Sequence, residues 1–384
     1  MTVPALTATR LAGTADLPLL VCGPSLGTSA VALWSAAAEL LGDRFHVVGW
    51  DLPGHGSSAP RQEPFTIADL AAAVLTLVDD LGSGPFAYAG DSVGGAVGLQ
   101  LLLDAPERVS AAVILCSGAR IGTPEMWQER AATVRASGTP VMVESSAQRW
   151  FAPGFIERQP VVSTTLLHAL QQADRLGYAA TCDALAEFDV RDRLGEITAP
   201  VLAVAGEHDV ATPVDLLGEL VSGLQHGRLV VLPDVAHLAP AEAPAAVASL
   251  IREHVPPVTL AERRAAGMAV RRAVLGEGYV DRASAAATDF TREFQEFITD
   301  YAWGGIWTRP GLDRRSRSLI TLTALVARGH HEELELHLRA ARANGLSDDE
   351  IKELLLQCAV YCGVPDANTA FRIAQRVLAE GREA

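Results

Sequence analysis

The sequence predicts an α/β domain built on a mostly parallel sheet, followed by an all-α domain. Over residues 1–255, short β-rich apolar runs alternate with helical segments, an order typical of a parallel sheet covered on both faces. Beyond this point the β-rich runs stop, and helical spacing of apolar residues continues towards residue 384. A chain of 384 residues also exceeds one ordinary hydrophobic core, so we expect two domains.

Six strands are expected in the first domain, each ending near Gly, Asp or Pro: LPLLVCGP, RFHVVGWD, PFAYAGD, AAVILCS, PVLAVAG and GRLVVLP. Helices separate most of them, for example at residues 67–81 and 93–104. The alternation lapses over residues 119–194, where helical stretches rich in Ala, Arg and Trp take over. Such an insertion is expected to form a lid over the carboxyl edge of the sheet.

A domain boundary is predicted at VPPVTLAE, because two prolines cannot continue a helix. We expect a linker at residues 256–261 and an all-α domain at residues 262–384. Its helical segments cover residues 262–276, 292–303, 314–329, 332–345, 347–363 and 368–381. Several end at glycine, as helix C-termini often do. Ser347 and Glu350 have the spacing of a capping box.

The composition excludes several protein classes. A hydrophobic content of 49% with 20% charged residues is typical of a globular protein and not of a disordered one. The longest apolar runs are far too short to span a membrane, and the N-terminus lacks the basic start and apolar stretch of a secretory signal. Five scattered cysteines argue against a disulfide framework and favour a reducing cytoplasm.

The formal net charge of −15 is unevenly shared, with −14 on residues 1–255 and −1 on the rest. An acidic surface repels nucleic acid and anionic lipid, so neither is expected as a partner. An anionic substrate would need a local arginine cluster to offset this field.

The motif Gly90-Asp91-Ser92-Val93-Gly94 matches G-x-S-x-G and lies between an expected strand and an expected helix. A tight turn in this context exposes a serine hydroxyl as a nucleophile. The N–H of Val93 would then stabilise an oxyanion at the helix N-terminus, and the N–H of Leu26, in GPSLG, is the second candidate donor. The alternative is an ordinary glycine-rich turn, which the strand-to-helix context disfavours.

A serine hydroxyl needs a base, and the base needs an orienting acid. In this kind of fold the chain order is Ser, acid, His. Asp209 follows the expected strand PVLAVAG, and His237 follows RLVVLP, each at the strand end where a triad member would lie. We therefore predict a Ser92–His237–Asp209 triad on an α/β-hydrolase fold.

Other polar residues near these strand ends are given structural roles. Asp234 and Glu207 are rival acids that we interpret as solvated loop charges. His208 and His254 lie at the wrong places in the chain for the base, and His55 in DLPGHGSS is expected to shape a turn.

The segments SLGTSAVALW, WDLPGHGSS, GDSVGG, GEHDVATP and AHLAP resemble the 3-oxoadipate enol-lactone hydrolases, a branch of the α/β-hydrolases. The resemblance spans residues 10–255 and implies hydrolysis of an anionic lactone, although esterases and haloperoxidase-like enzymes share the motifs. The substrate carboxylate needs a cation. Candidates in the lid are Arg130, Arg135 and Arg149, with Trp127 and Trp150 as pocket walls. For any single arginine, a solvated lid charge is the alternative.

From about residue 262, YVDRA, YAWGGIWTRPGLDRRSRSLITLTALVA, EELELHLRAARANGL and AVYCGVPDA resemble 4-carboxymuconolactone decarboxylase. The resemblance implies a proton donor and cationic partners. Glu333 and His337 are four residues apart on one helix face and could hold a poised imidazole. Arg317 and Tyr361 fall in matched motifs and are candidates for carboxylate binding and proton handling. The alternative is a surface ion pair and a solvated arginine.

Two further features concern this helical domain. Where the family has His-Val before DRA, this chain has Tyr279-Val280, so Tyr279 must substitute if that histidine matters. Cys358 and Cys362 lie one helical turn apart, outside the C-x-x-C pattern of related thiol peroxidases, and are expected to be packing residues.

Together the two resemblances imply a bifunctional enzyme for consecutive steps of aromatic catabolism through protocatechuate, with no metal or organic cofactor. The decarboxylase resemblance also implies a homo-oligomer built through the helical domain. The main alternative is a serine esterase or lactonase for another substrate, in which the helical domain serves only for assembly.

Overall fold

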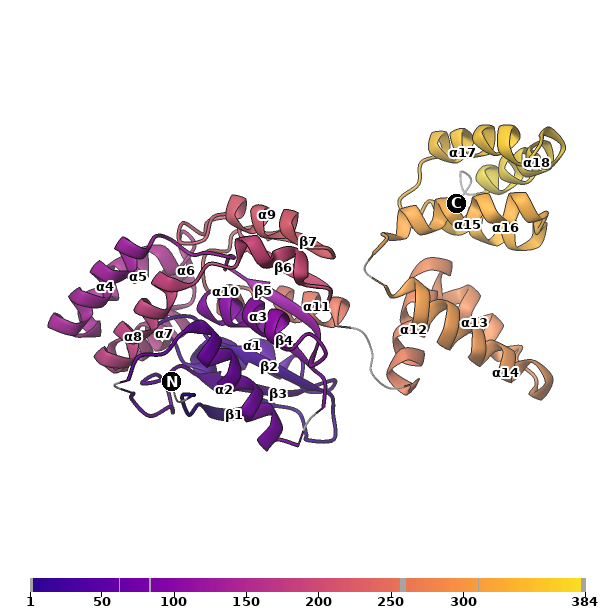
Figure 1. Ribbon diagram of the computed structural model, residues 1–384. Coiled ribbons are helices and arrows are strands. Elements are labelled where there is room, and N and C mark those ends of the chain that lie inside the picture. Colours follow the sequence, from indigo (N-terminus) through magenta and orange to yellow (C-terminus); the bar gives the residue numbers. More distant parts are fainter. Residues whose placement is uncertain (1–2, 62, 83, 256–259, 310, 381–384) are drawn as a thin grey trace. The chain divides into compact units, whose positions relative to one another are not determined.

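The computed structural model describes residues 3–61, 63–82, 84–255, 260–309 and 311–380. The chain divides into two compact units, Met1–Val255 and Pro256–Ala384, which are described separately below (Figure 1). Of the linker expected at residues 256–261, positions 256–259 lie outside the described residues.

The first unit is built on a seven-stranded mixed sheet with the order β1-β3-β2-β4-β5-β6-β7. The strands are β1 (Thr7–Ala12), β2 (Leu19–Gly23), β3 (His46–Asp51), β4 (Phe86–Asp91), β5 (Val109–Leu115), β6 (Val201–Gly206) and β7 (Gly227–Leu232). All neighbours pair in parallel except β1, which pairs antiparallel with β3. The predicted α/β class is confirmed, but the edge strand β1 was not expected.

Helices joined to these strands complete the first core. They are α1 (Ala30–Glu39), α2 (Ile67–Asp80), α3 (Val93–Asp104), α9 (Val214–Gly223), α10 (Ala239–Glu242) and α11 (Pro244–His254). The central strands β2, β3, β4 and β6 are buried at every position, as continuous apolar strands of a parallel sheet must be. The helix α2 begins with a capping box between Thr66 and Asp69.

Between β5 and β6 the chain forms only helices. They are α4 (Pro124–Ser137), η1 (Thr139–Met142), α5 (Val143–Trp150), α6 (Phe155–Arg158), α7 (Pro160–Gln172), α8 (Arg175–Glu187) and η2 (Arg191–Glu196). The five α-helices of this insertion, α4 to α8, gather at one end of the unit (Figure 1). Trp150, Leu170 and Tyr178 from this segment belong to the same hydrophobic core as the sheet. We refer to residues 119–194 as the lid.

The described part of the second unit contains helices and no strand, which confirms the predicted all-α class. The helices are α12 (Leu260–Leu275), α13 (Glu277–Ala285), α14 (Asp289–Ile298), η3 (Thr299–Trp307, a π-helix), α15 (Arg314–Arg328), α16 (His331–Ala341), α17 (Asp348–Tyr361) and α18 (Val364–Glu380). Helix α13 was not expected. Ser347 and Glu350 form the predicted capping box, and Gly329 ends α15 in the left-handed conformation.

Helices α15 to α18 share a core that includes Leu322, Leu334, Leu338 and Leu355. Helix α14 buries none of its residues and carries exposed aromatic side chains along one face. In the described part of the chain, no helix combines the length and apolar character needed to cross a membrane.

Candidate active sites

Ser92 occupies a strained turn between β4 and α3. Its backbone angles are φ 55° and ψ −115°, a region that costs energy for any residue with a side chain. Two hydrogen bonds to the end of β5 hold the turn in place: the Ser92 N–H donates to the carbonyl of Leu115 (2.8 Å), and the Ser117 hydroxyl donates to the carbonyl of Ser92 (2.7 Å). The backbone thus projects the serine side chain from the sheet edge.

The glycines of the motif are required by close backbone packing. A Cβ atom on Gly94 would lie 2.6 Å from the carbonyl carbon of Gly23, and one on Gly90 would collide with the backbone of Gly94. The N–H of Gly94 donates to the carbonyl of Pro24 (2.9 Å). The start of α3 is therefore fixed directly against the loop that follows β2.

The structure brings Ser92, His237 and Asp209 together. His237 Nε2 lies 3.0 Å from Ser92 Oγ, and His237 Nδ1 lies 2.8 Å from Asp209 Oδ2. Asp209 follows β6 and His237 follows β7, so the three residues meet at the carboxyl edge of the parallel strands. All three are buried. This is the geometry by which a base takes the proton of a serine nucleophile.

Hydrogen-bond donors to both carboxylate oxygens hold Asp209 in its orientation. Its Oδ1 accepts the N–H groups of Ala211 (2.8 Å) and Thr212 (3.0 Å), while its Oδ2 accepts the Thr212 hydroxyl (2.6 Å) as well as the imidazole of His237. Burial raises the pKa of Asp209, but the charge of His237 and these hydrogen bonds outweigh burial and leave the pKa below its ordinary value. The acid is therefore ionised.

Two backbone N–H groups are available for an oxyanion. Val93 is the first residue of α3, so its N–H has no acceptor within the helix. The N–H of Leu26 has no hydrogen-bond partner among the described residues. Its loop is held by a tight turn in which the Thr28 N–H donates to the carbonyl of Ser25 (3.1 Å).

Lid residues lie directly on this loop. A Cβ atom on Gly27 would fall 2.6 Å from Leu170 Cδ1, 3.3 Å from Tyr178 Cε2 and 3.4 Å from Trp150 Cη2. The carbonyl of Trp150 also accepts the N–H of His237 (3.2 Å). The lid therefore covers the oxyanion loop and contacts the loop that carries the base.

Two of the three lid arginines interact with Tyr178, Arg130 through a hydrogen bond and Arg149 electrostatically. Arg130 Nε donates to the Tyr178 hydroxyl (2.9 Å), and its guanidinium lies over the ring of Trp127 (5.6 Å to the centroid). Arg149 is half-buried, and its pKa is lowered by burial and by the neighbouring charge of Arg130. No carboxylate of the described residues forms an ion pair with either. By contrast, Arg135 is partly exposed and is paired with Asp183.

Glu242 is a half-buried group that the sequence did not single out. Its Oε2 accepts the N–H of Ala152 in the lid (2.8 Å), and its Oε1 accepts the N–H of Ala236 next to the histidine (2.9 Å). Burial raises its pKa, although these hydrogen bonds oppose the change. One carboxylate thus joins the lid to the histidine loop.

Asp91, beside the nucleophile, differs from every acid above. Its side chain is fully buried, and neither carboxylate oxygen has a hydrogen-bond partner among the described residues. Burial, and then the nearby Asp209 and Glu242, raise its pKa well above the ordinary value. The neutral acid is therefore the favoured form.

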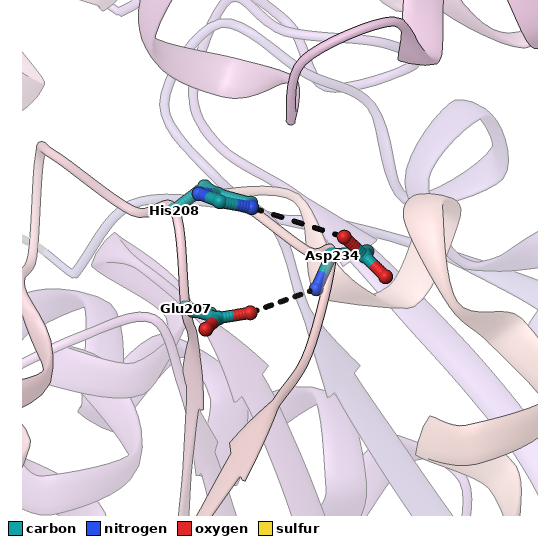
Figure 2. A group of neighbouring side chains, drawn as sticks. All are labelled: Glu207, His208 and Asp234. Carbon is teal, nitrogen blue, oxygen red and sulfur yellow. Dashed lines mark hydrogen bonds and ion pairs between the residues drawn. The ribbon is translucent and has the colours of Figure 1, made fainter.

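The rival acids lie outside the triad. Glu207, His208 and Asp234 are exposed and point toward one another (Figure 2). His208 Nε2 lies 3.9 Å from Asp234 Oδ1, and the Asp234 N–H donates to Glu207 Oε2 (3.3 Å). Exposed acidic groups of this kind are common without a bound metal ion. The cluster does not enter the hydrogen bonds of Ser92 or His237 among the described residues.

The other histidines have structural contacts. His55 Nδ1 lies 3.1 Å from the carbonyl of Pro53, and its ring stacks on Tyr178. His254 Nε2 lies 3.2 Å from the carbonyl of Pro200. Neither forms a hydrogen bond to the triad in the described part of the chain.

In the second unit the four candidate residues do not form a connected hydrogen-bond network like that of the triad, among the described residues. Glu333 is exposed and His337 half-buried on α16; burial lowers the pKa of His337 more than the charge of Glu333 raises it. Arg317 donates to the carbonyls of Arg309 (2.8 Å) and Leu312 (3.1 Å), and Tyr361 is 79% exposed. Among the described residues, no hydrogen bond or ion pair links any two of these four side chains.

Cys358 in α17 and Cys362 at its C-terminal cap do not resemble a redox centre. Both thiols are free, and burial raises the pKa of Cys358. Reactivity requires the thiolate, so this environment suppresses it.

Comparison with known proteins assigns the two parts of the chain separately. The profile of the α/β hydrolase fold family matches residues 18–137, and that of the carboxymuconolactone decarboxylase family matches residues 292–376. The chain is 37% identical over 234 residues to 3-oxoadipate enol-lactonase 2 of Acinetobacter baylyi, covering 61% of this chain and 87% of that protein. It is 47% identical over 116 residues to 4-carboxymuconolactone decarboxylase of the same organism, covering 30% of this chain and 87% of that protein.

The chain belongs to both families, as a fusion. The hydrolase unit also resembles the crystal structure of the enol-lactonase from Burkholderia xenovorans LB400, with a TM-score of 0.62 and 31% identity over 64% of this chain and 94% of that one. The decarboxylase-family unit is 47% identical over 112 residues to nitrosuccinic acid decarboxylase of Metarhizium robertsii, covering 29% of this chain and 78% of that protein.

Proposed function

We propose that this protein catalyses two consecutive reactions of the β-ketoadipate pathway. The decarboxylase-family unit converts 4-carboxymuconolactone to 3-oxoadipate enol-lactone, and the hydrolase unit opens that lactone to 3-oxoadipate. The proposal rests on one observation above all: each unit matches its own single-activity relative over 87% of that relative's length. Both reactions act on small anionic lactones.

In the hydrolase unit, His237 takes the hydroxyl proton of Ser92 as Oγ attacks the lactone carbonyl. The N–H groups of Leu26 and Val93 bind the oxyanion, and Asp209 holds the imidazole in the required tautomer. Collapse of the intermediate breaks the ring C–O bond, and His237 returns the proton to the leaving enol oxygen. Water, deprotonated by His237, then releases the product from the acyl-enzyme.

The substrate carboxylate is bound by Arg130 and Arg149. Both guanidiniums lack a carboxylate partner among the described residues, and Tyr178, which Arg130 contacts, lies beside Gly27 of the oxyanion loop. Replacing either arginine with glutamine should raise the KM for the enol-lactone about tenfold or more, since a charge-assisted hydrogen bond is worth roughly 1.5–3 kcal/mol. Arg135→Gln is the matched control, because Arg135 is already paired with Asp183. An unchanged KM in both variants would refute this assignment.

In the decarboxylase-family unit, the departing CO₂ leaves its electron pair in the unsaturated ring, and a proton is added to a ring carbon. His337 supplies that proton. Burial favours its neutral form in the free protein, and an anionic lactone bound beside it would raise its pKa towards the imidazolium. Arg317 and Tyr361 are the proposed partners for carboxylate binding and proton handling, and Glu333 orients the imidazole.

The helical unit also joins copies of the chain. Helix α14 and the start of η3 expose aromatic side chains on one face: Phe290 (95%), Phe294 (62%), Phe297 (57%) and Tyr301 (62%). Contiguous aromatic surface of this kind is typical of an interface between subunits, so Phe294→Glu should reduce the mass measured by light scattering. We also propose a location in the cytoplasm, whose reducing environment keeps free thiols such as these five reduced.

A coupled assay of the full chain with 4-carboxymuconolactone tests the proposal by following CO₂ and 3-oxoadipate together. Ser92→Ala should abolish 3-oxoadipate formation while CO₂ release continues and enol-lactone accumulates. His337→Asn should reduce CO₂ release and leave hydrolysis of added enol-lactone intact. If the wild-type protein releases no CO₂ but hydrolyses other esters, the helical unit serves assembly alone.

A further inference from the structure

Arg271 of α12 is a buried arginine without an anionic partner among the described residues. The residue is only 5% exposed. Its guanidinium donates hydrogen bonds to neutral groups only: Nη1 to the hydroxyl of Thr299 (3.3 Å) and Nη2 to the side-chain carbonyl of Gln295 (2.9 Å). The Nε–H has no hydrogen-bond partner among the described residues. A guanidinium carries five donors and a permanent charge, so neutral acceptors leave it incompletely satisfied.

A second arginine on the same helix shows the contrast. Arg264, two turns earlier, binds the carboxylate of Asp300 with both Nε (2.9 Å) and Nη2 (2.7 Å) and also pairs with Glu296. Asp281 of α13 is paired with Arg272 (2.7 Å). Glu296, Asp300 and Asp281 are thus paired with other arginines, and none of the described carboxylates pairs with Arg271.

The surroundings of Arg271 are fixed by close helix packing. A Cβ atom on Gly267, one turn before it, would lie 2.5 Å from the carbonyl oxygen of Thr299, so α12 and η3 meet backbone to backbone. Thr299 is the first residue of the π-helix η3. This conformation is rare in proteins overall, and where it occurs it is often at a functional site. The half-buried Tyr279 from α13 lies close enough to interact electrostatically with the guanidinium.

We propose that Arg271, with Tyr279 and Gln295, forms a binding site for a small organic carboxylate in the helical unit. The identity of its natural ligand rests on the proposed function. The site would hold the carboxylate that 4-carboxymuconolactone retains after CO₂ leaves. The Nε edge of the guanidinium, which has no hydrogen-bond partner among the described residues, donates to the carboxylate, and the neighbouring Tyr279 lines the same side of the site. A buried charge without a counter-ion is costly, and an anionic ligand would remove this cost.

The relatives' names are compatible with such a site. The matched decarboxylases are named for 4-carboxymuconolactone and for nitrosuccinic acid. Succinic acid derivatives carry two carboxyl groups, so one remains after decarboxylation, as it does in the lactone. A fixed cation for the retained carboxylate would serve both reactions.

The test uses the full chain and adipate, a saturated dicarboxylate that cannot react. Isothermal titration compares wild type with Arg271→Gln, two proteins with the same hydrolase unit, so any binding lost belongs to the helical unit. We expect loss of one adipate site per chain or weakening of that site by about tenfold or more, and a similar rise in the KM for decarboxylation with a smaller change in kcat. Arg264→Gln, which removes an existing ion pair, should leave adipate binding unchanged.

Thermal unfolding without ligand separates this role from a structural one. A ligand-binding arginine is expected to leave the melting temperature of Arg271→Gln equal to or above that of the wild type, because the uncompensated charge is gone. If the melting temperature falls instead, Arg271→Lys is measured: a folded lysine variant that binds adipate as poorly as the glutamine variant overturns the proposal.

The remaining outcomes are also decisive. Wild-type adipate binding and KM in Arg271→Gln refute the site while leaving the proposed function intact. Arg271-dependent adipate binding in a protein that releases no CO₂ supports the site and refutes the proposed decarboxylation. A change in oligomeric state on replacing Arg271, with no change in adipate binding, assigns its counter-ion to a second copy of the chain and overturns the proposal.

Discussion

Replacement of Asp209 by asparagine should inactivate the hydrolase unit through the tautomer of His237. In the wild type, Oδ1 of Asp209 accepts two backbone N–H groups, from Ala211 and Thr212. An asparagine must keep its single carbonyl oxygen at this position, since an amide NH₂ there would face two donors. Its NH₂ then replaces Oδ2, 2.8 Å from His237 Nδ1, and donates to that nitrogen.

With Nδ1 accepting, the proton of the neutral imidazole moves to Nε2, the nitrogen that lies 3.0 Å from Ser92 Oγ. The base then cannot accept the serine proton. We expect kcat for enol-lactone hydrolysis to fall by about 10³–10⁴, in line with the fall of about 10⁴ known for a wrong tautomer in a serine triad. At 1.36 kcal/mol per tenfold change, this is a barrier increase of about 4–5.5 kcal/mol.

The assay is steady-state hydrolysis of the enol-lactone, with CO₂ release from 4-carboxymuconolactone by the same preparation as an internal control for folding. Thr212→Val is the matched variant: it removes one hydrogen bond to Oδ2 but keeps the carboxylate and the tautomer, so kcat should fall by about tenfold or less. If Asp209→Asn retains kcat within tenfold of the wild type, the tautomer reasoning is wrong.

Four other changes test separate features. Gly94→Ala places a methyl group against Gly23 and should displace an oxyanion donor, lowering kcat for the lactone by about 10²–10³. Asp91→Asn should raise the melting temperature at pH 8 but not at pH 4. The pKa of Asp91 is raised in the folded protein, so at pH 8 the carboxyl group is ionised in the unfolded chain and must take up a proton on folding. That cost to stability is largely lost near pH 4, where Asp91 is partly protonated in the unfolded chain too. Glu242→Gln should leave one of two backbone N–H groups without its acceptor and cost about 1–3 kcal/mol of unfolding free energy in denaturant titrations. His337→Asn should slow CO₂ release by about 10² or more in a direct gas assay; release within threefold of wild type excludes His337 as the proton donor.

The sequence predicted the regular parts of the fold because each depends on local pattern. Helix α3 begins and ends at the expected residues, Val93 and Asp104, and the six expected strands are readable as apolar runs. Strand β1 was missed because an edge strand with a half-exposed TATRLA pattern has no apolar signal. Helix α13 was missed because EGYVDRASA lacks the spacing of an apolar face.

The residues of the candidate sites also differ in whether a local sequence pattern predicts them. Ser92, Asp209 and His237 were chosen from chain order and strand ends, and the structure brings them within hydrogen-bonding distance. Tyr178 and Glu242 carry no local signal, because their contacts join residues 48 and 90 positions apart in the chain. Only the folded chain distinguishes them from an ordinary core tyrosine and a surface acid.

The bridge made by Glu242 constrains how substrate enters the hydrolase unit. Residues 150–152 of the lid bind the histidine loop through the carbonyl of Trp150 and through this carboxylate. If that stretch moved outward, the general base would lose its support during each turnover. Substrate must therefore enter through another part of the lid. The segment around Trp150 stays in place during entry and release, so the imidazole of His237 keeps its alignment.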